Sequence, residues 1–186
     1  MYFCSKLAKH DTVMKHLFSF FLLLFSIVTI SAQKVNVITD DFTGEKVVTT
    51  DYLKIYQGGA TGMNQTRIRF RHENKKDYIE YRIFTDDATS SCKKGQKLLI
   101  KTDDGVVETT NVSNVVALPG AWSAKPINNK FGIYIICSFS ITEIQGKNIQ
   151  KIRINFSDGY IDLEIKDKDS AKLQQYITAF LEALSN

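Results

Sequence analysis

Residues 64–85 read NQTRIRFRHENKKDYIEYRIFT, and this stretch decides the fold. Apolar and polar side chains alternate in both of its halves, which is the pattern of two half-buried β-strands joined by a turn. Lys75 and Lys76 as central turn residues place Arg71 opposite Glu80 on one face, with apolar pairs on the other. Because such cross-strand pairs fix the register, the stretch predicts an antiparallel hairpin.

Two further stretches, 98–110 and 149–165, repeat this pattern around Asp-Gly, a strong hairpin signal. If each Asp-Gly pair occupies the centre of its turn, the opposite-charge pairs Lys101–Glu108 and Arg153–Glu164 lie across the strands. Alternation also predicts strands near residues 34–38, 47–56 and 131–141. The chain therefore predicts consecutive antiparallel strands.

The last part of the chain follows a different period. Between residues 170 and 184, apolar side chains recur at helical spacing and form one stripe: Leu173, Tyr176, Ile177, Phe180, Leu181 and Leu184. This stripe needs a partner, and the sheet is the candidate. We therefore expect a mainly β fold, an antiparallel β-sandwich or half-open barrel of about eight strands capped by one C-terminal α-helix.

The beginning of the chain carries the pattern of a secretory signal peptide. Residues 17–30 are an apolar run that follows a basic start and precedes Ala32. A helix of this length falls short of the hydrocarbon core of a membrane. We expect a signal peptide over residues 1–32, starting at Met1 or Met14, and a single β-rich domain over 33–186. The product is then periplasmic or extracellular, without stable membrane insertion after cleavage.

Composition limits the chemistry that the domain can perform. The formal charge of +4 over 186 residues is small for a nucleic-acid partner. His72 is the one histidine of residues 33–186, and we expect a structural role for it. Adjacent acids at 40–41, 86–87 and 103–104 diverge on a strand or lie in turns, which does not suit a paired-carboxylate hydrolase. We expect no catalytic residue, no metal and no cofactor.

Binding residues are easier to nominate than catalytic ones. Arg67 and Arg69 share a strand face, and the predicted hairpin places Arg82 opposite Arg69, which favours an anionic ligand or acidic partner. Trp122 lies in a long stretch that contains both prolines; it is either an interaction hot spot or a lid over the core. Cys92 and Cys137 form a disulfide or remain two reduced thiols, and the sequence fits both readings.

Two motifs carry a resemblance to other proteins: DDFTGEK at residues 40–46, and IRINFSDGYI at 152–161 before the terminal helix. With these motifs the chain resembles small exported proteins of Gram-negative bacteria. The resemblance implies export and no particular activity. The leading hypothesis is an exported, non-catalytic module that binds a protein or a glycan. The alternatives are a glycosidase-like hydrolase that uses carboxylates and a proteinaceous inhibitor of a hydrolase.

Overall fold

The computed structural model describes residues 35–58, 64–85, 90–119 and 131–186. These residues belong to one unit of the chain, which spans Gln33–Asn186. The predicted signal peptide over 1–32 lies outside the described residues. Within the described ranges, no helix combines the length and the apolar character that crossing a membrane requires.

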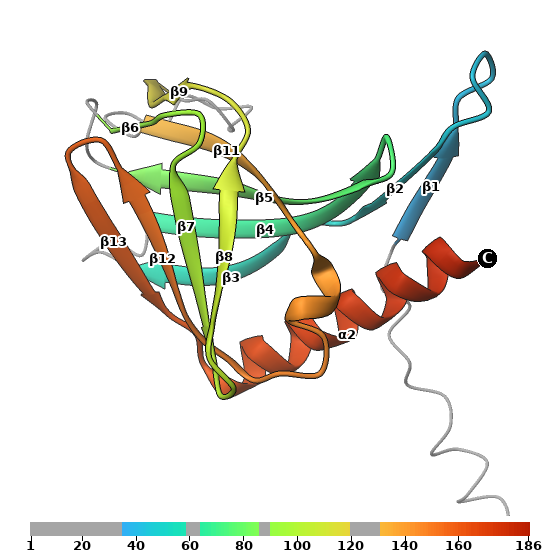
Figure 1. Cartoon of the computed structure of the whole chain (residues 1–186). Coiled ribbons are helices and arrows are strands. Elements are labelled where there is room, and N and C mark those ends of the chain that lie inside the picture. Colours follow the sequence, from blue (N-terminus) through green and yellow to red (C-terminus); the bar gives the residue numbers. More distant parts are fainter. Residues whose placement is uncertain (1–34, 59–63, 86–89, 120–130) are drawn as a thin grey trace, which may run out of the picture. The chain divides into compact units, whose positions relative to one another are not determined.

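Antiparallel strands make up most of the described structure (Figure 1). The elements are β1 (Val35–Thr39), β2 (Lys46–Thr50), β3 (Leu53–Gly58), β4 (Asn64–Glu73), β5 (Lys76–Thr85), β6 (Ser91–Cys92), β7 (Lys97–Thr102), β8 (Val106–Asn111), β9 (Val115–Val116), β10 (Leu118–Pro119), β11 (Phe131–Phe139), the 3₁₀-helix η1 (Ile141–Glu143), β12 (Ile149–Phe156), β13 (Gly159–Glu164) and α2 (Asp167–Ser185). Eleven strands form one sheet in the order β1-β2-β4-β5-β11-β8-β7-β12-β13, with β3 on β4 and β10 on β11; β6 and β9 pair separately. The predicted mainly β, antiparallel fold with one C-terminal helix is confirmed.

All three predicted hairpins form, but each turn lies one residue earlier than predicted. In the β4–β5 hairpin, Asn74 and Lys75 are central, with φ of 52° and 58°. Asparagine tolerates positive φ better than most residues, which favours this placement over Lys75–Lys76. Arg69 is therefore opposite Glu80, a position predicted for Arg71.

The other two turns shift for a related reason. Gly105 and Gly159 do not sit at the centre of their turns but follow two central residues, with φ of 148° and 155° that only glycine adopts readily. As a result, Arg153 faces Asp162 rather than Glu164, and Lys101 faces Val106 rather than Glu108. Every partner moves by two positions, so each side chain keeps its predicted face.

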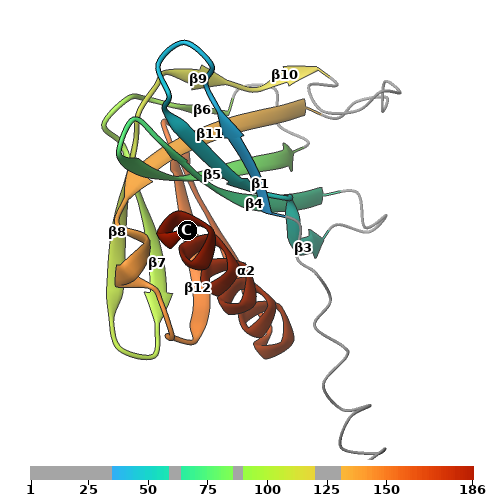
Figure 2. The ribbon, with the colours of Figure 1, turned by 90° about the vertical axis from the view of Figure 1, so that its right-hand side faces the viewer.

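The helix α2 closes the apolar face of the sheet. It begins three residues earlier than predicted, and its buried residues include Leu173, Ile177 and Phe180. The rings of Phe180 and Phe70 lie 6.1 Å apart between centroids. Figures 1 and 2 show α2 crossing from the start of β12 to the neighbourhood of β1 and β2, which it contacts.

Polar contacts along its length fix the position of α2. The hydroxyl of Ser170 accepts a hydrogen bond from the backbone N–H of Ile149 at 2.8 Å. The side chain of Gln174 bonds three backbone groups of the segment between η1 and β12, at distances of 2.7–3.0 Å. Near the other end of the helix, Lys46 Nζ donates to the carbonyl of Ala183 at 2.8 Å. These bonds fasten α2 to the sheet at both of its ends.

Candidate functional site

The candidate site lies on the face of β4 and β5 that points away from the core. Ile68 and Phe70 of β4 are buried beneath the sheet, at 1% exposure each. Side chains alternate along a strand, so the arginines that flank Ile68 and Phe70 in the sequence lie on the opposite face: Arg67, Arg69 and Arg71. The Cα partner of Arg67 on β5 is Arg82, rather than the predicted pairing of Arg82 with Arg69. All three predicted arginines nevertheless share this face.

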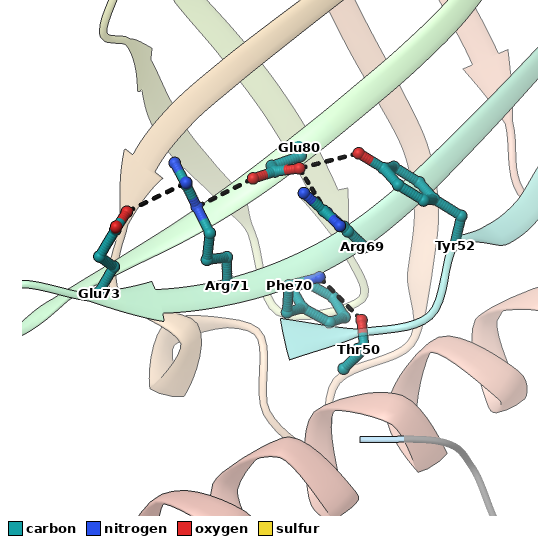
Figure 3. Close-up of polar contacts among 7 residues, drawn as sticks. All are labelled: Thr50, Tyr52, Arg69, Phe70, Arg71, Glu73 and Glu80. Carbon is teal, nitrogen blue, oxygen red and sulfur yellow. Dashed lines mark hydrogen bonds and ion pairs between the residues drawn. The ribbon is translucent and has the colours of Figure 1, made fainter. Parts of the chain in front are cut away.

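Glu80 lies at the centre of this face and is fully buried, with a side-chain exposure of 0%. Arg69 Nε approaches its Oε2 at 2.5 Å, and Arg71 Nε lies 2.9 Å from its Oε1. The hydroxyl of Tyr52, just before β3, donates to Oε2 at 2.8 Å. Figure 3 shows the carboxylate held between these three side chains, with Glu73 binding the far side of Arg71.

The surroundings of Glu80 keep it ionised. Burial alone raises the pKa of a carboxyl group, but hydrogen bonds from Arg69, Tyr134 and Tyr52 outweigh burial and hold the pKa of Glu80 below its ordinary value. Burial and the adjacent carboxylate raise the pKa of Tyr52, so its hydroxyl remains a neutral donor. Glu80 is thus a fixed negative charge that positions two arginines.

Cation–π contacts with tyrosine rings also hold arginines of this face. The guanidinium of Arg82 lies 3.9 Å from the centroid of Tyr52, and that of Arg69 lies 4.6 Å from it. Arg71 lies over the ring of Tyr78 at 5.1 Å. Such cation–π contacts restrict the long side chains and cover the rings. We call the group Tyr52, Arg67, Arg69, Arg71, Tyr78, Glu80 and Arg82 the Arg–Tyr face.

The charged groups of the Arg–Tyr face are four arginines and the buried carboxylate of Glu80. Glu80 pairs with Arg69 and Arg71, and Glu73 at the border pairs with Arg71. Arg67 itself is exposed and bonds the neutral side chain of Gln65 at 3.3 Å. The arrangement can therefore attract an anion from solvent without first breaking an ion pair at Arg67.

Sequence reasoning did not nominate Tyr52, Tyr78 or Glu80 for the site. Glu80 entered the prediction only as the cross-strand partner of Arg71, and its central, buried position depends on the register. Tyr52 carried no signal, because it joins the site through the pairing of β3 with β4, which local patterns do not encode. The sequence signal that did point to the site was the alternation of arginine with apolar residues.

Of the other nominated residues, the structure describes Cys92 and Cys137, and neither belongs to the Arg–Tyr face. Trp122 lies outside the described residues, as do Asp86 and Asp87. Cys92 and Cys137 are free, buried thiols, and burial raises their pKa values to about 11 and about 12.

The sole histidine of the domain has a local partner. His72 Nδ1 lies 2.7 Å from Asp77 Oδ1 in the β4–β5 hairpin. This contact at the end of the hairpin fits the structural role expected for the histidine.

Hydrolytic chemistry has little support in the described part of the chain. The carboxyl groups with shifted pKa values, Asp40, Glu80 and Asp162, all shift downward, whereas a general acid needs an upward shift. Asp103 and Asp104 form the centre of the β7–β8 turn, and Lys147 pairs with Asp104 at 2.9 Å. No cluster of potential metal ligands occurs among the described residues.

Comparison of the chain with protein-family models, curated proteins and solved structures gives no match. The functional argument therefore depends on the geometry and charge of the Arg–Tyr face.

Proposed function

We propose that the protein is exported after removal of residues 1–32 and that it acts as a non-catalytic binding module. Its ligand is an anionic glycan, a polymer that carries carboxylate or sulfate groups, and the binding surface is the Arg–Tyr face. The observation that carries this proposal is the row of arginines along one face of β4, in which Arg67 is exposed and bonds the neutral side chain of Gln65 at 3.3 Å. Such a row of cations attracts an anionic ligand from solvent.

The spacing of the arginines favours an extended ligand. Alternate residues of a strand lie about 6.8 Å apart, so Arg67, Arg69 and Arg71 form a row of roughly 14 Å along β4. Arg82 stands about 4.8 Å to the side, on the neighbouring strand. A polymer with regularly spaced negative groups can contact several of these guanidiniums at once, and each one can grip a planar carboxylate or a sulfate.

Single-stranded nucleic acid is the competing polyanion, and the face suits it less well. Its recognition uses aromatic rings that are open for base stacking. Here the ring of Tyr52 is already contacted by Arg69 and Arg82, and Arg71 covers Tyr78. The modest formal charge of +4 is a second argument against a nucleic-acid ligand.

Titration with heparin and with polygalacturonate, followed by calorimetry at low and at physiological salt, tests the proposal. Arg67→Gln removes an exposed cation without touching Glu80, and we expect it to weaken binding at least roughly threefold and to reduce the salt dependence.

The matched control is Arg153→Gln. Arg153 lies over Tyr160 at 4.1 Å, as Arg69 and Arg82 lie over Tyr52, and it pairs with Asp162 on a surface of β12 and β13 where the charges balance. The proposal would be contradicted by any of three results: equal losses of affinity in both variants, no binding to either glycan at low salt, or tighter binding to single-stranded RNA than to the glycans.

A further inference from the structure

The turn between β1 and β2 presents an aromatic side chain that the fold leaves unused. Phe42 is 99% exposed. Hydrogen bonds hold the turn around it: Asp40 Oδ1 accepts from the backbone N–H groups of Phe42 and Thr43 at 2.9 and 2.7 Å, and from the Thr43 hydroxyl. The N–H of Gly44 closes the turn on the carbonyl of Asp40 at 2.8 Å. We call residues 40–45 the hairpin tip.

The hairpin tip is acidic as well as aromatic. Asp40, Asp41 and Glu45 surround Phe42. Hydrogen bonds from Thr43 and Phe42 lower the pKa of Asp40, so this carboxylate remains charged in mildly acidic solution. Lys46, which follows the tip in the sequence, donates to the carbonyl of Ala183 in α2. An exposed ring on a preorganised, negatively charged turn has the properties of a binding hot spot.

A pocket with complementary properties lies elsewhere on the same chain. It is open to solvent, has a volume of about 430 Å³, and lies between β3, the end of β13 and the first turn of α2. Two apolar side chains of the core reach it, Ile55 at 4% and Ile165 at 7% exposure, and three lysines line its rim: Lys54, Lys166 and Lys168. Glu164 and Asp169 also line it, and Glu164 is paired with Lys151 at 2.6 Å. We call this the lysine pocket.

The hairpin tip and the lysine pocket belong to opposite ends of α2. Lys46, next to the tip, contacts Ala183 near the end of the helix, whereas Lys166 and Lys168 precede and begin it. Fifteen helical residues separate Lys168 from Ala183, a distance of about 22 Å. Figure 1 shows the β1–β2 turn extending away from the sheet beyond the C-terminal end of α2. The tip of one copy therefore lies far from its own pocket.

We propose that the hairpin tip of one copy docks into the lysine pocket of a second copy. The ring of Phe42 then occupies the pocket and contacts the exposed edges of Ile55 and Ile165, while the carboxylates of the tip face the lysines of the rim. Because donor and acceptor are different surfaces, the contact is heterologous, and it leaves one free tip and one free pocket on every pair. Repetition of the contact produces head-to-tail assemblies, independently of the glycan proposal.

Analytical ultracentrifugation of the purified protein over a wide concentration range tests self-association. We expect the weight-average mass to rise with concentration and to fall with added salt. Phe42→Ala should weaken association at least roughly tenfold, because it removes one buried aromatic side chain. The control is Tyr160→Ala, which removes another exposed aromatic residue near a hairpin turn, at 60% exposure, and should leave the mass unchanged.

A mixing experiment identifies the two surfaces. The variant Phe42→Ala keeps the pocket, and the double variant Lys166→Glu/Lys168→Glu keeps the tip, so each alone should be monomeric. Mixed in equal amounts, they should form a 1:1 dimer and nothing larger. The proposal is overturned by a wild-type protein that is monomeric at all concentrations, by a mixture that stays monomeric, or by a Tyr160→Ala effect as large as that of Phe42→Ala. Circular dichroism confirms that each variant is folded.

Discussion

Replacement of Glu80 by glutamine tests whether the buried carboxylate organises the Arg–Tyr face. The change leaves Arg69 and Arg71 without their shared counter-charge. Loss of one partner of a buried ion pair costs about 3–5 kcal/mol. Here the arginine side chains are 26% and 23% exposed, so water solvates part of the released charge. Glutamine also retains an acceptor for Tyr52. We therefore expect Glu80→Gln to lower the free energy of unfolding by about 2–3 kcal/mol.

Thermal and urea denaturation followed by circular dichroism measure this loss. In a domain of this size, it corresponds to a melting temperature lower by roughly 5–10 °C. The control is Asp162→Asn, which breaks a partly exposed pair with Arg153 and should cost at most about 1 kcal/mol.

The dependence of this loss on pH gives a second, independent check. Because the pKa of Glu80 is lowered in the folded protein, its contribution to stability is complete above its unfolded pKa of about 4.3 and is lost as the pH falls through the lower folded value. The stability difference between wild type and Glu80→Gln should therefore shrink below about pH 4. A loss under about 1 kcal/mol at pH 7, or a difference that stays constant in acid, would refute this account of Glu80.

Three further outcomes follow from the packing of α2 and of the core. Ser170→Ala deprives the buried N–H of Ile149 of its acceptor and should cost about 1–3 kcal/mol in urea denaturation, whereas an unchanged midpoint would show that another group replaces the hydroxyl. Phe180→Ala removes a fully buried ring that packs on Phe70 and should cost about 3–5 kcal/mol, unless α2 contributes little to the core. Burial raises the pKa of Cys137 to about 12, so mass spectrometry should find this thiol unmodified by iodoacetamide at pH 8 in the native protein and modified after denaturation; native labelling would contradict its burial.

The fold was predictable because its two main signals are periodic. Alternation at period two marked the strands, and spacing at period 3.6 marked α2, whose stripe includes Leu173, Ile177 and Phe180. The turns were misplaced by one residue, yet an error of one residue in a turn changes each cross-strand partner by two positions. Each side chain therefore lies on the face predicted for it, and the core residues were predicted correctly although the register was not.

The candidate site was less predictable, because it depends on partners rather than faces. The common face of Arg67, Arg69 and Arg82 followed from alternation alone. Predicting the position of Glu80 would have required the correct β4–β5 register. Predicting the contribution of Tyr52 would have required the pairing of β3 with β4. Tertiary pairings of this kind leave no local pattern in the sequence.

The observed register also distributes charge along the Arg–Tyr face. In the predicted register, Glu80 would lie directly opposite Arg71, and Arg82 would lie opposite Arg69. The actual turn at Asn74–Lys75 places Glu80 opposite Arg69, within reach of Arg71 as well.

One carboxylate therefore serves the two arginines nearest the hairpin turn, while Arg67 and Arg82 face each other farther along β4 and β5. Arg67 is exposed and bonds the neutral side chain of Gln65, whereas Glu80 holds Arg69 and Arg71, so an anion at Arg67 does not compete with that buried carboxylate. We therefore expect the Arg67–Arg82 end of the face, rather than the end near Glu80, to contribute most of the affinity for an anion.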